Sequence, residues 1–307
     1  MNKIAITTGD PNGIGAEITI KALNKLRLPQ ESIVIISNKK ILDFYGKLDT
    51  DYELIEIPFE ADITPGKITA DCGEFSYKSL LKAIEIKPDG LVTAPIAKNA
   101  LYMAGHKFNG HTEILQQFLA HDGQKAEMLF VAKDFRVLLL TRHCALKDIV
   151  LTKECVVEKV LKLQEFFNNK LGIIHPKFAL CGLNPHSGED GILGSEELEI
   201  LNPAVKALRT KGINITYPLP ADTLFIDAAK NYYSDKKLPY DCYIANYHDQ
   251  GLIPIKTVAG DDTVNMTIGL DIIRTSPGHG TAFDIAGKNI AREDDMIAAI
   301  NAVLKFV

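Results

Sequence analysis

Residues 4–26, IAITTGDPNGIGAEITIKALNKL, contain the pattern on which the fold of this 307-residue chain depends. Residues 4–8 form a short apolar run typical of a buried strand, and residues 17–26 have the apolar spacing of a helix. The loop between them, residues 9–15, has backbone N–H groups that could bind an anion. It is neither a GxGxxG motif nor a P-loop, so a structural turn and a ligand loop are both open interpretations.

The same alternation of short Val- and Ile-rich runs with longer helical segments continues along the chain and predicts βαβ units. Further strands are expected at residues 33–37, 90–94, 178–181, 243–246 and 253–257. Further helices are expected at residues 75–86, 111–121, 153–168, 196–211 and 294–306. Residues 128–132 and 136–141 flank a polar turn and predict an antiparallel pair, so we expect a mixed sheet.

Length and composition favour an ordinary soluble protein with two domains. A chain of 307 residues is near the size at which one hydrophobic core stops growing, and a pocket at a domain junction is common. The net charge of −5 and the absence of a Lys/Arg block argue against a nucleic-acid partner. No apolar run is long enough to span a membrane and no signal peptide is recognisable, which predicts a cytoplasmic protein without a membrane partner. The five cysteines are scattered and predict neither disulfides nor a thiolate zinc site.

Three histidines, His143, His186 and His248, each follow an apolar strand. Strand ends that converge on one cleft could supply three imidazoles to one metal ion, with open positions for a substrate. Their separations of 43 and 62 residues exclude a zinc finger or an HExxH helix. From spacing alone, a single histidine is more often an ordinary polar core or surface residue.

A second group of polar residues has the character of an anion site. His111 and Thr112 open a predicted helix, so the free N–H groups of its first turn would face a negative charge. Lys256, Asn265 and Arg274 are nine residues apart along the last predicted strands and suit a phosphate or carboxylate. The alternative is that Lys256 and Arg274 are solvated surface charges.

Several motifs occur in the order found in one enzyme family. GLNPHSGE at 182–189, PADTLF at 220–225 and YHDQG at 247–251 resemble the 4-hydroxythreonine-4-phosphate dehydrogenase family, and the resemblance extends from Gly9 to Gly287. GIGAE at 13–17 and GHGTAFDIAG at 278–287 resemble loops of the wider isocitrate and isopropylmalate dehydrogenase superfamily. Asn12, Ala16 and Ser187 depart from the family's usual residues without removing a ligand.

The resemblance implies an α/β fold of two α/β/α domains with mixed sheets and an active-site cleft between them. The first domain would be discontinuous, approximately residues 1–105 plus 256–307. The second, approximately residues 106–255, would carry the metal-binding histidines and the dimer interface. Members of the family that the sequence resembles are homodimers with the active site at the interface. We therefore expect one subunit to complete the metal site of the other.

The resemblance also implies an oxidation that depends on NAD or NADP and on one divalent metal ion, which could be zinc, magnesium, manganese or cobalt. The substrate would be 4-phosphooxy-L-threonine, a phosphorylated hydroxy amino acid. Its 3-oxo product loses carbon dioxide to give 3-amino-2-oxopropyl phosphate, toward pyridoxine 5'-phosphate. The residues carried over are His143, His186 and His248 for the metal, and His111, Thr112, Lys256, Asn265 and Arg274 for the substrate.

Other roles and activities stay open at this point. His279, Gly280 and Thr281 would lie along the cofactor, and Asp222, or less favourably Lys98, would act as the general base. Related enzymes oxidise 4-phospho-D-threonate or D-erythronate 4-phosphate, and no residue excludes those substrates. A metal-dependent hydrolase or lyase and a non-catalytic metabolite-binding protein are the remaining alternatives.

Overall fold

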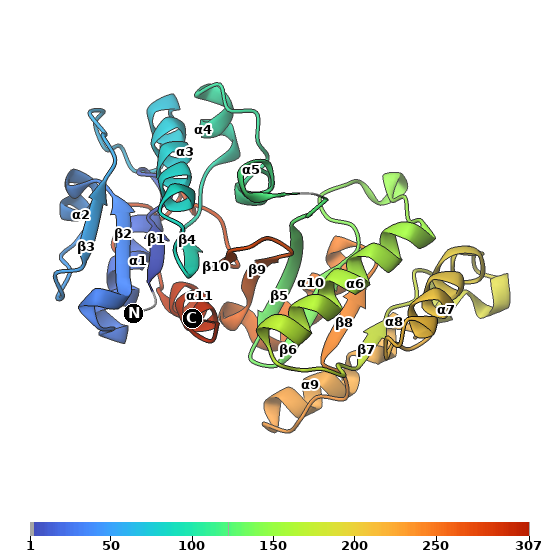
Figure 1. Ribbon diagram of the computed structural model, residues 1–307. Helices are drawn as coiled ribbons and strands as arrows, with labels where there is room; N and C mark the ends of the chain where they lie inside the picture. The colour runs from blue at the N-terminus through green and yellow to red at the C-terminus, as the bar shows by residue number, and fades with distance from the viewer. Residues whose placement is uncertain (1–2, 122, 307) are drawn as a thin grey trace. The chain divides into compact units, whose positions relative to one another are not determined.

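The computed structural model describes residues 3–121 and 123–306 (Figure 1). The chain forms two compact units: unit 1 is Met1–Ala126 with Val264–Val307, and unit 2 is Glu127–Thr263. Unit 1 is discontinuous. Its boundaries lie at 126/127 and 263/264, whereas the division expected from the resemblance was at 105/106 and 255/256. The first boundary lies later because helix α5 (His111–Leu119) packs into the core of unit 1.

Unit 1 contains a mixed sheet with the strand order β3-β2-β1-β4-β10-β9. Its strands are β1 (Ile4–Thr7), β2 (Ile33–Ser37), β3 (Glu53–Glu56), β4 (Gly90–Thr93), β9 (Val264–Ile268) and β10 (Ile273–Pro277). All neighbouring pairs are parallel except β10 with β9, which is antiparallel. The central strands are buried along their whole length, which explains why each is apolar up to its last residue.

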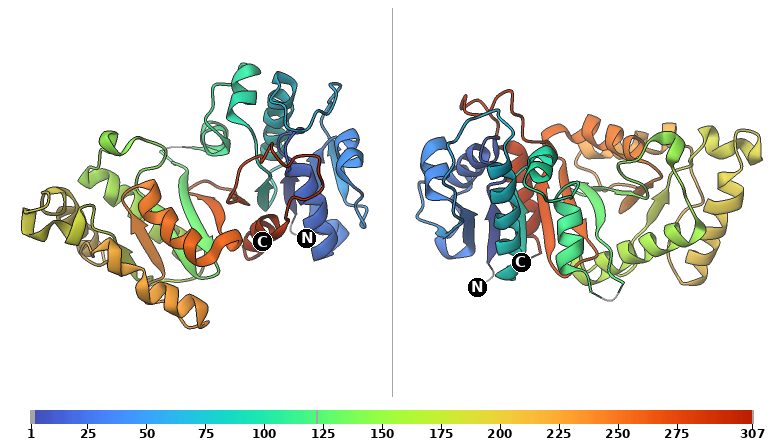
Figure 2. Two further views of the ribbon diagram at one scale, coloured as in Figure 1. Left: turned by 180° about the vertical axis from the view of Figure 1, so that it is seen from behind. Right: turned by 90° about the horizontal axis from the view of Figure 1, so that it is seen from above.

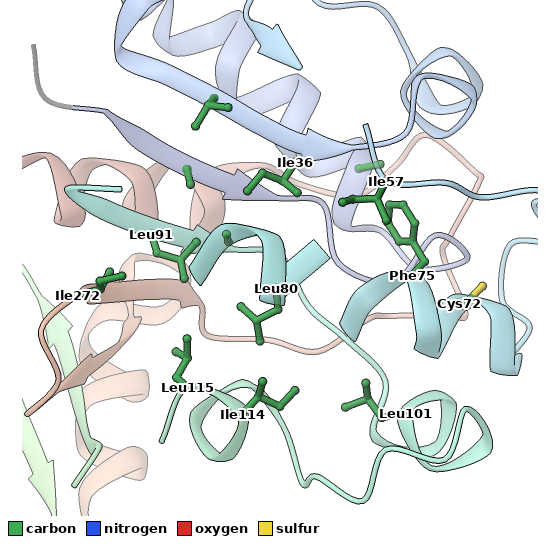
Figure 3. Packing of buried hydrophobic residues seen from close by; sticks show 14 of the residues in the cluster. Ile36, Ile57, Cys72, Phe75, Leu80, Leu91, Leu101, Ile114, Leu115 and Ile272 are labelled. Atoms are coloured by element: carbon green, nitrogen blue, oxygen red, sulfur yellow. The ribbon is translucent and has the colours of Figure 1, made fainter. Parts of the chain in front are cut away.

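Helices cover both faces of this sheet, with α3 and α5 on one face and α1 and α11 on the other (Figures 1 and 2). Their bounds are α1 (Gly15–Leu26), α2 (Lys39–Tyr45), α3 (Ala70–Glu85), α4 (Lys98–Met103), α5 (His111–Leu119), α11 (Asp294–Leu304) and the short η1 (Gln30–Ser32). Figure 3 shows Leu80 of α3 pointing toward Ile114 and Leu115 of α5, beside Leu91 of β4. These apolar contacts fix the position of α5, and therefore of the two polar residues at its start.

Unit 2 contains a smaller mixed sheet with the strand order β5-β6-β8-β7. Its strands are β5 (Glu127–Ala132), β6 (Phe135–Leu139), β7 (Phe178–Leu180) and β8 (Cys242–Ala245). β5 and β6 form the predicted antiparallel pair, whereas β8 is parallel to both β6 and β7. Parallel neighbours end at the same edge of a sheet, so the segments that follow β6, β7 and β8 start from one edge.

The helices of unit 2 include both long amphipathic elements and short turns. They are α6 (Lys153–Lys170), α7 (Asn202–Thr210), α8 (Ala221–Leu224), α9 (Ile226–Tyr233), α10 (His248–Ala259), η2 (Leu146–Asp148), η3 (Pro185–Gly191), η4 (Glu197–Leu201) and η5 (Gly260–Asp262). The helix expected at 196–211 is interrupted, because its first turn, η4, is a π-helix that precedes α7.

The strand expected at residues 253–257 is wrong, because this segment belongs to helix α10. Gly251, Leu252 and Ile255 are buried at helical spacing, whereas Ile253 is 63% exposed. A Cβ on Gly251 would lie 2.6 Å from the side chain of Leu139, so glycine allows α10 to lie directly on β6. Tertiary packing therefore overrides the strand propensity of the β-branched residues.

Two further expectations concern the whole chain. No helix among the described residues combines the length and apolar character that a membrane span requires. The five cysteines are free thiols, of which Cys72, Cys181 and Cys242 are buried.

Candidate functional site

The three candidate metal ligands all lie in unit 2, after the three parallel strands. His143 follows β6 in a loop, His186 lies in η3 after β7, and His248 is the first residue of α10 after β8. Because β6, β8 and β7 are neighbours, their carboxyl ends supply all three histidines from one edge of the sheet. The sequence prediction placed each of them after a strand, and the structure agrees.

Two of these histidines are brought together. The ring centroids of His143 and His248 are 5.2 Å apart, and both residues line a cavity of about 280 Å³ with Arg142, Cys144 and Tyr247. His186 is 62% exposed. Among the described residues, no three His, Cys, Asp or Glu side chains are grouped closely enough to hold a metal ion. A single chain therefore presents two adjacent imidazoles and a third that is accessible.

Carboxylates orient two of the imidazoles. His248 Nδ1 lies 2.6 Å from Asp249 Oδ1, and His186 Nδ1 lies 2.5 Å from Glu189 Oε1. A carboxylate can only accept, so each Nδ1 donates its proton and Nε2 is the ring atom left to bind an ion. The hydrogen bond to Glu189 raises the pKa of His186, and its charge adds to this effect, so an ion at His186 would displace a proton. Imidazoles with carboxylate partners are a donor set that zinc and similar ions prefer, so these residues fit a metal.

The backbone around His186 has an unusual conformation. His186, Ser187, Gly188, Glu189 and Asp190 all have positive φ, between 42° and 81°. Residues other than glycine rarely adopt this region, and such strain persists only where the surrounding structure holds it in place. Nothing in the sequence predicted this left-handed run.

The polar residues of unit 1 form a second, buried group. His111 and Thr112 are the first residues of α5, where a helix leaves its N–H groups without intrahelical partners. Asn265 on β9 is opposite Ser276 on β10, two residues after Arg274. Arg274 is 3% exposed, and its Nε and Nη2 donate to Thr93 Oγ1 at 2.8 and 2.6 Å. Arg274 is therefore not the solvated surface charge that the sequence left as an alternative.

The electrostatics of this buried group favour an anion. Burial lowers the pKa of Arg274, with the charge of Glu113 acting against that change. Burial, and then the positive charge of Arg274, lower the pKa of His111 well below its usual value, so its imidazole is neutral. His111 Nε2 and Asn265 Oδ1 are buried without a hydrogen-bond partner among the described residues. Buried polar atoms without partners mark a place that a ligand can fill.

The structure places the remaining candidates as follows. Lys256 is exposed on α10 in unit 2. Its predicted position on a strand is wrong, because residues 253–257 belong to that helix. Asn265 and Arg274 do lie on strands, as predicted. Asp222 is exposed on α8, and its charge contributes to the raised pKa of His186. Lys98 begins α4, with Nζ 5.4 Å from the ring centroid of Tyr102.

The candidate cofactor loop packs on the glycine-rich first loop of unit 1. The backbone N–H of Ile14 donates to the carbonyl of Thr281 at 3.1 Å, and a Cβ on Gly13 would lie equally close to that carbonyl. His279 Nδ1 lies 2.9 Å from the carbonyl of the adjacent Gly280. Gly13 in the first loop thus allows a close contact between the two loops.

Three residues that hold candidate site residues in place were not predicted from the sequence. Glu189 and Asp249 are visible in the motifs HSGE and HD, where an acid close to a histidine could have indicated a carboxylate–histidine pair. Thr93, which holds Arg274, had no such signal because it is one of several threonines at strand ends.

Comparison with known proteins adds to this geometry. Residues 5–303 match the family model described as "Pyridoxal phosphate biosynthetic protein PdxA". The chain belongs to the PdxA family. A 4-hydroxythreonine-4-phosphate dehydrogenase of Sulfurihydrogenibium sp. (strain YO3AOP1) is 40% identical, over 99% of this chain and 98% of the relative. A D-threonate 4-phosphate dehydrogenase of Pectobacterium atrosepticum is 35% identical, over 98% of each chain.

Solved structures confirm the predicted fold class. The crystal structure of 4-hydroxythreonine-4-phosphate dehydrogenase from Klebsiella pneumoniae matches with a TM-score of 0.86 and 31% identity, over 99% of this chain and 98% of that one. Isocitrate dehydrogenase from Methylococcus capsulatus, at 14% identity and a TM-score of 0.51, shares the fold alone. The names of the PdxA relatives support an oxidoreductase.

Proposed function

We propose that this PdxA-family protein oxidises the secondary alcohol of 4-phosphooxy-L-threonine, with NAD or NADP as the oxidant and one divalent metal ion. The 3-oxo acid then loses carbon dioxide to give 3-amino-2-oxopropyl phosphate. The observation that carries the proposal is the buried Arg274 beside His111, whose Nε2 has no partner among the described residues. Such a group suits the 4-phosphate that appears in the names of both PdxA relatives quoted above.

In this proposal, the polar residues of unit 1 form an anion group that binds the phosphate end of the substrate. The anion group consists of His111, Thr112, Asn265 and Arg274. Arg274 offers a planar, permanently charged fork, and Thr112 offers a hydroxyl at the positive end of α5. His111 and Asn265 complete the set with neutral polar atoms, and Lys256 adds a second positive charge. Binding at this remote group positions C3 of the substrate for reaction.

His143, His186 and His248 would hold the metal ion, with one subunit of a homodimer completing the metal site of the other. The ion, when bound, supplies a Lewis acid for the reacting oxygen. Asp249 and Glu189 keep the imidazoles in the tautomer that ligation needs. Asp222 would accept the hydroxyl proton, and His279, Gly280 and Thr281 would line the cofactor site.

A second candidate substrate is 4-phospho-D-threonate. It is favoured by the 35% identical relative from Pectobacterium atrosepticum, which is named for that substrate. The phosphate, hydroxyl and carboxylate of the two compounds correspond, so the same anion group and histidines would serve both.

The test measures absorbance at 340 nm with the purified full-length protein, a divalent metal and NAD or NADP. 4-Phosphooxy-L-threonine and 4-phospho-D-threonate are offered separately, each with and without a chelator. We expect chelator-sensitive reduction of the cofactor with the amino acid. Faster reduction with the threonate would reassign the substrate and keep the chemistry. Absence of reduction with both would overturn the proposal in favour of a hydrolase, a lyase or a binding protein.

A further inference from the structure

Glu197 is a buried carboxylate with no role in the proposal above. It begins the π-helical turn η4 and is 3% exposed. Among the residues that the structure describes, it forms no ion pair with a basic side chain. A π-helical turn is uncommon and is often found next to functional sites. A buried carboxylate also requires hydrogen-bond donors, so the groups that face Glu197 indicate what it does.

The donors that face Glu197 belong to the chain just before His186. Oε1 accepts from the backbone N–H groups of Leu183 and Asn184 at 2.7 and 2.8 Å. Oε2 accepts from Asn184 Nδ2 at 2.9 Å. One carboxylate therefore holds two consecutive peptide groups and the side chain of the second residue.

Glu197 also contacts the other side of the loop. A Cβ on Gly188 would lie 2.8 Å from Glu197 Oε2, so the backbone of Gly188 packs directly on the carboxylate. Leu183 and Asn184 precede His186, and Gly188 follows it. His186 is thus at the tip of a segment that one carboxylate holds at both ends.

This arrangement explains how the left-handed run at His186 persists. Four residues of the run are not glycine, and each is held in a region of φ that L-residues avoid. Charge-assisted hydrogen bonds from a carboxylate to backbone N–H groups are strong and directional. Glu197 supplies such bonds just before the run, at Leu183 and Asn184, and close packing at its centre, at Gly188.

We propose that Glu197 is a positioning residue for His186, holding the 183–190 loop in its left-handed conformation so that Nε2 of His186 is presented to a divalent cation. The inference rests on the proposed metal-binding role of His186 and extends it to a residue outside the ligand set. Both oxygens of Glu197 already accept hydrogen bonds from the backbone and side chain of the loop, which is why we assign it to the loop and not to the ion.

The substitutions Glu197→Gln and Glu197→Ala separate the parts of this role. Glutamine keeps one oxygen for the two backbone donors but places an NH₂ group where Oε2 accepts from Asn184. Alanine removes both acceptors. Glu199→Gln is the matched control, because Glu199 is an exposed residue of the same π-helical turn and undergoes the same change of charge. His186→Ala defines the effect of losing the ligand itself.

The experiment titrates Co²⁺ into the metal-free, full-length protein and follows the visible absorption of the bound ion. We expect Co²⁺ binding to weaken about 10-fold in Glu197→Gln and about 100-fold in Glu197→Ala, within the usual range for outer-sphere partners, with an altered spectrum in both. Glu199→Gln should bind within about twofold of the wild type. Thermal melting shows that each variant is folded at the temperature used, and Glu197→Gln remains informative if Glu197→Ala does not fold.

The outcomes distinguish this inference from the proposed function. If His186→Ala binds Co²⁺ as tightly as the wild type, His186 is not a ligand, and both the metal assignment and the inference fail. If His186→Ala loses Co²⁺ but the folded Glu197 variants keep the wild-type affinity and spectrum, only the inference is overturned. A lower melting temperature without a change in Co²⁺ binding would show that Glu197 is merely structural.

Discussion

The anion group of unit 1 and the histidines of unit 2 are built in opposite ways. Arg274 is 3% exposed on a strand inside a sheet, and His111 begins a helix that is fixed by Ile114 and Leu115. His186 is 62% exposed in a loop whose backbone is strained. The anion group is thus organised by the core of its unit, whereas His186 depends on local carboxylates.

This difference shows which part of the chemistry one chain can prepare by itself. The anion group already has its charge and its unpaired polar atoms in place. The metal ligands are two adjacent imidazoles and one accessible imidazole, an arrangement open to completion by a second subunit. Substitutions in the two regions should therefore fail in different ways.

Removing a histidine should give the largest effect. We expect His248→Ala and His186→Ala to reduce turnover by more than the roughly 100-fold that loss of an outer-sphere partner costs, because a metal ligand itself is removed. The dissociation constant for 4-phosphooxy-L-threonine should change far less, since the anion group stays intact. His175→Ala, at an exposed histidine, is the control. A large loss of substrate affinity in the metal-ligand variants would contradict the separation of the two regions.

Arg274→Lys should have the next largest effect. Lysine keeps the charge but cannot donate as a planar fork, so the loss of charge-assisted hydrogen bonds should raise KM about 10- to 100-fold. The value of kcat should fall less, because the histidines are unchanged. Steady-state kinetics separate the two parameters, and Arg292→Lys at a side chain that is 73% exposed is the control. An unchanged KM would remove Arg274 from the anion group.

Asp10→Asn tests how much stability unit 1 loses when the buried Asp10 carboxyl is ionised. Burial raises the pKa of Asp10 to about 6. The cost to stability is therefore absent below the unfolded pKa of 3.8, grows as pH rises toward 6, and is complete above it. A shift of two pKa units lowers the stability of the wild type by about 3 kcal/mol at high pH. In the asparagine variant this cost is removed, but an amide N–H left without a partner costs about 1 kcal/mol.

Denaturant unfolding at pH 7.5 and pH 4 measures this effect. The asparagine variant keeps the acceptor for the backbone N–H of Asn12 and should be about 1–2 kcal/mol more stable at pH 7.5. The gain should largely disappear at pH 4. A variant that is destabilised at both values would show that the Asp10 carboxylate has a partner that the fold requires.

The smallest effect should come from the exposed pair of His186 and Glu189 in the metal-free protein. Glu189 raises the pKa of His186, so the pair stabilises the folded state below the usual histidine pKa of 6.5, and the effect is lost as pH rises through the raised value. The unfolding midpoints of wild type and Glu189→Gln should therefore differ slightly at pH 5.5 and converge at pH 9. A difference that grows with pH would contradict the assigned direction of the shift, in which Glu189 raises the pKa of His186.

Much of the fold could be predicted because its strands are buried on both sides. Residues 33–37 and 90–93 are buried throughout and apolar up to their last residue, and the helices between strands keep their apolar spacing. The segment 253–257 could not be assigned in this way, because Ile253 and Ile255 suit a strand or a helix equally by composition. Burial of Ile255 and exposure of Ile253 come from packing on β6, which no local pattern contains.

The candidate site was predictable where function coincides with a motif. His111 at a helix start and the positions of the three histidines after strands followed from the sequence. The left-handed backbone at His186 did not, because it is imposed by contacts distant in sequence. Glu197 did leave a signal, since it lies at helical spacing with the buried Leu201, Ala204 and Leu208, where a charged residue is unexpected.

The discontinuity of unit 1 has a consequence for how the protein is made on the ribosome. Strand β10 lies between β4 and β9, and α11 is fastened to it where Thr275 Oγ1 donates to the carbonyl of Ala299 at 2.8 Å. The first 126 residues therefore emerge from the ribosome long before the strand and helix that complete their core. Unit 2, although it starts later, is the first unit whose residues have all emerged, so its folding can precede completion of unit 1 during synthesis.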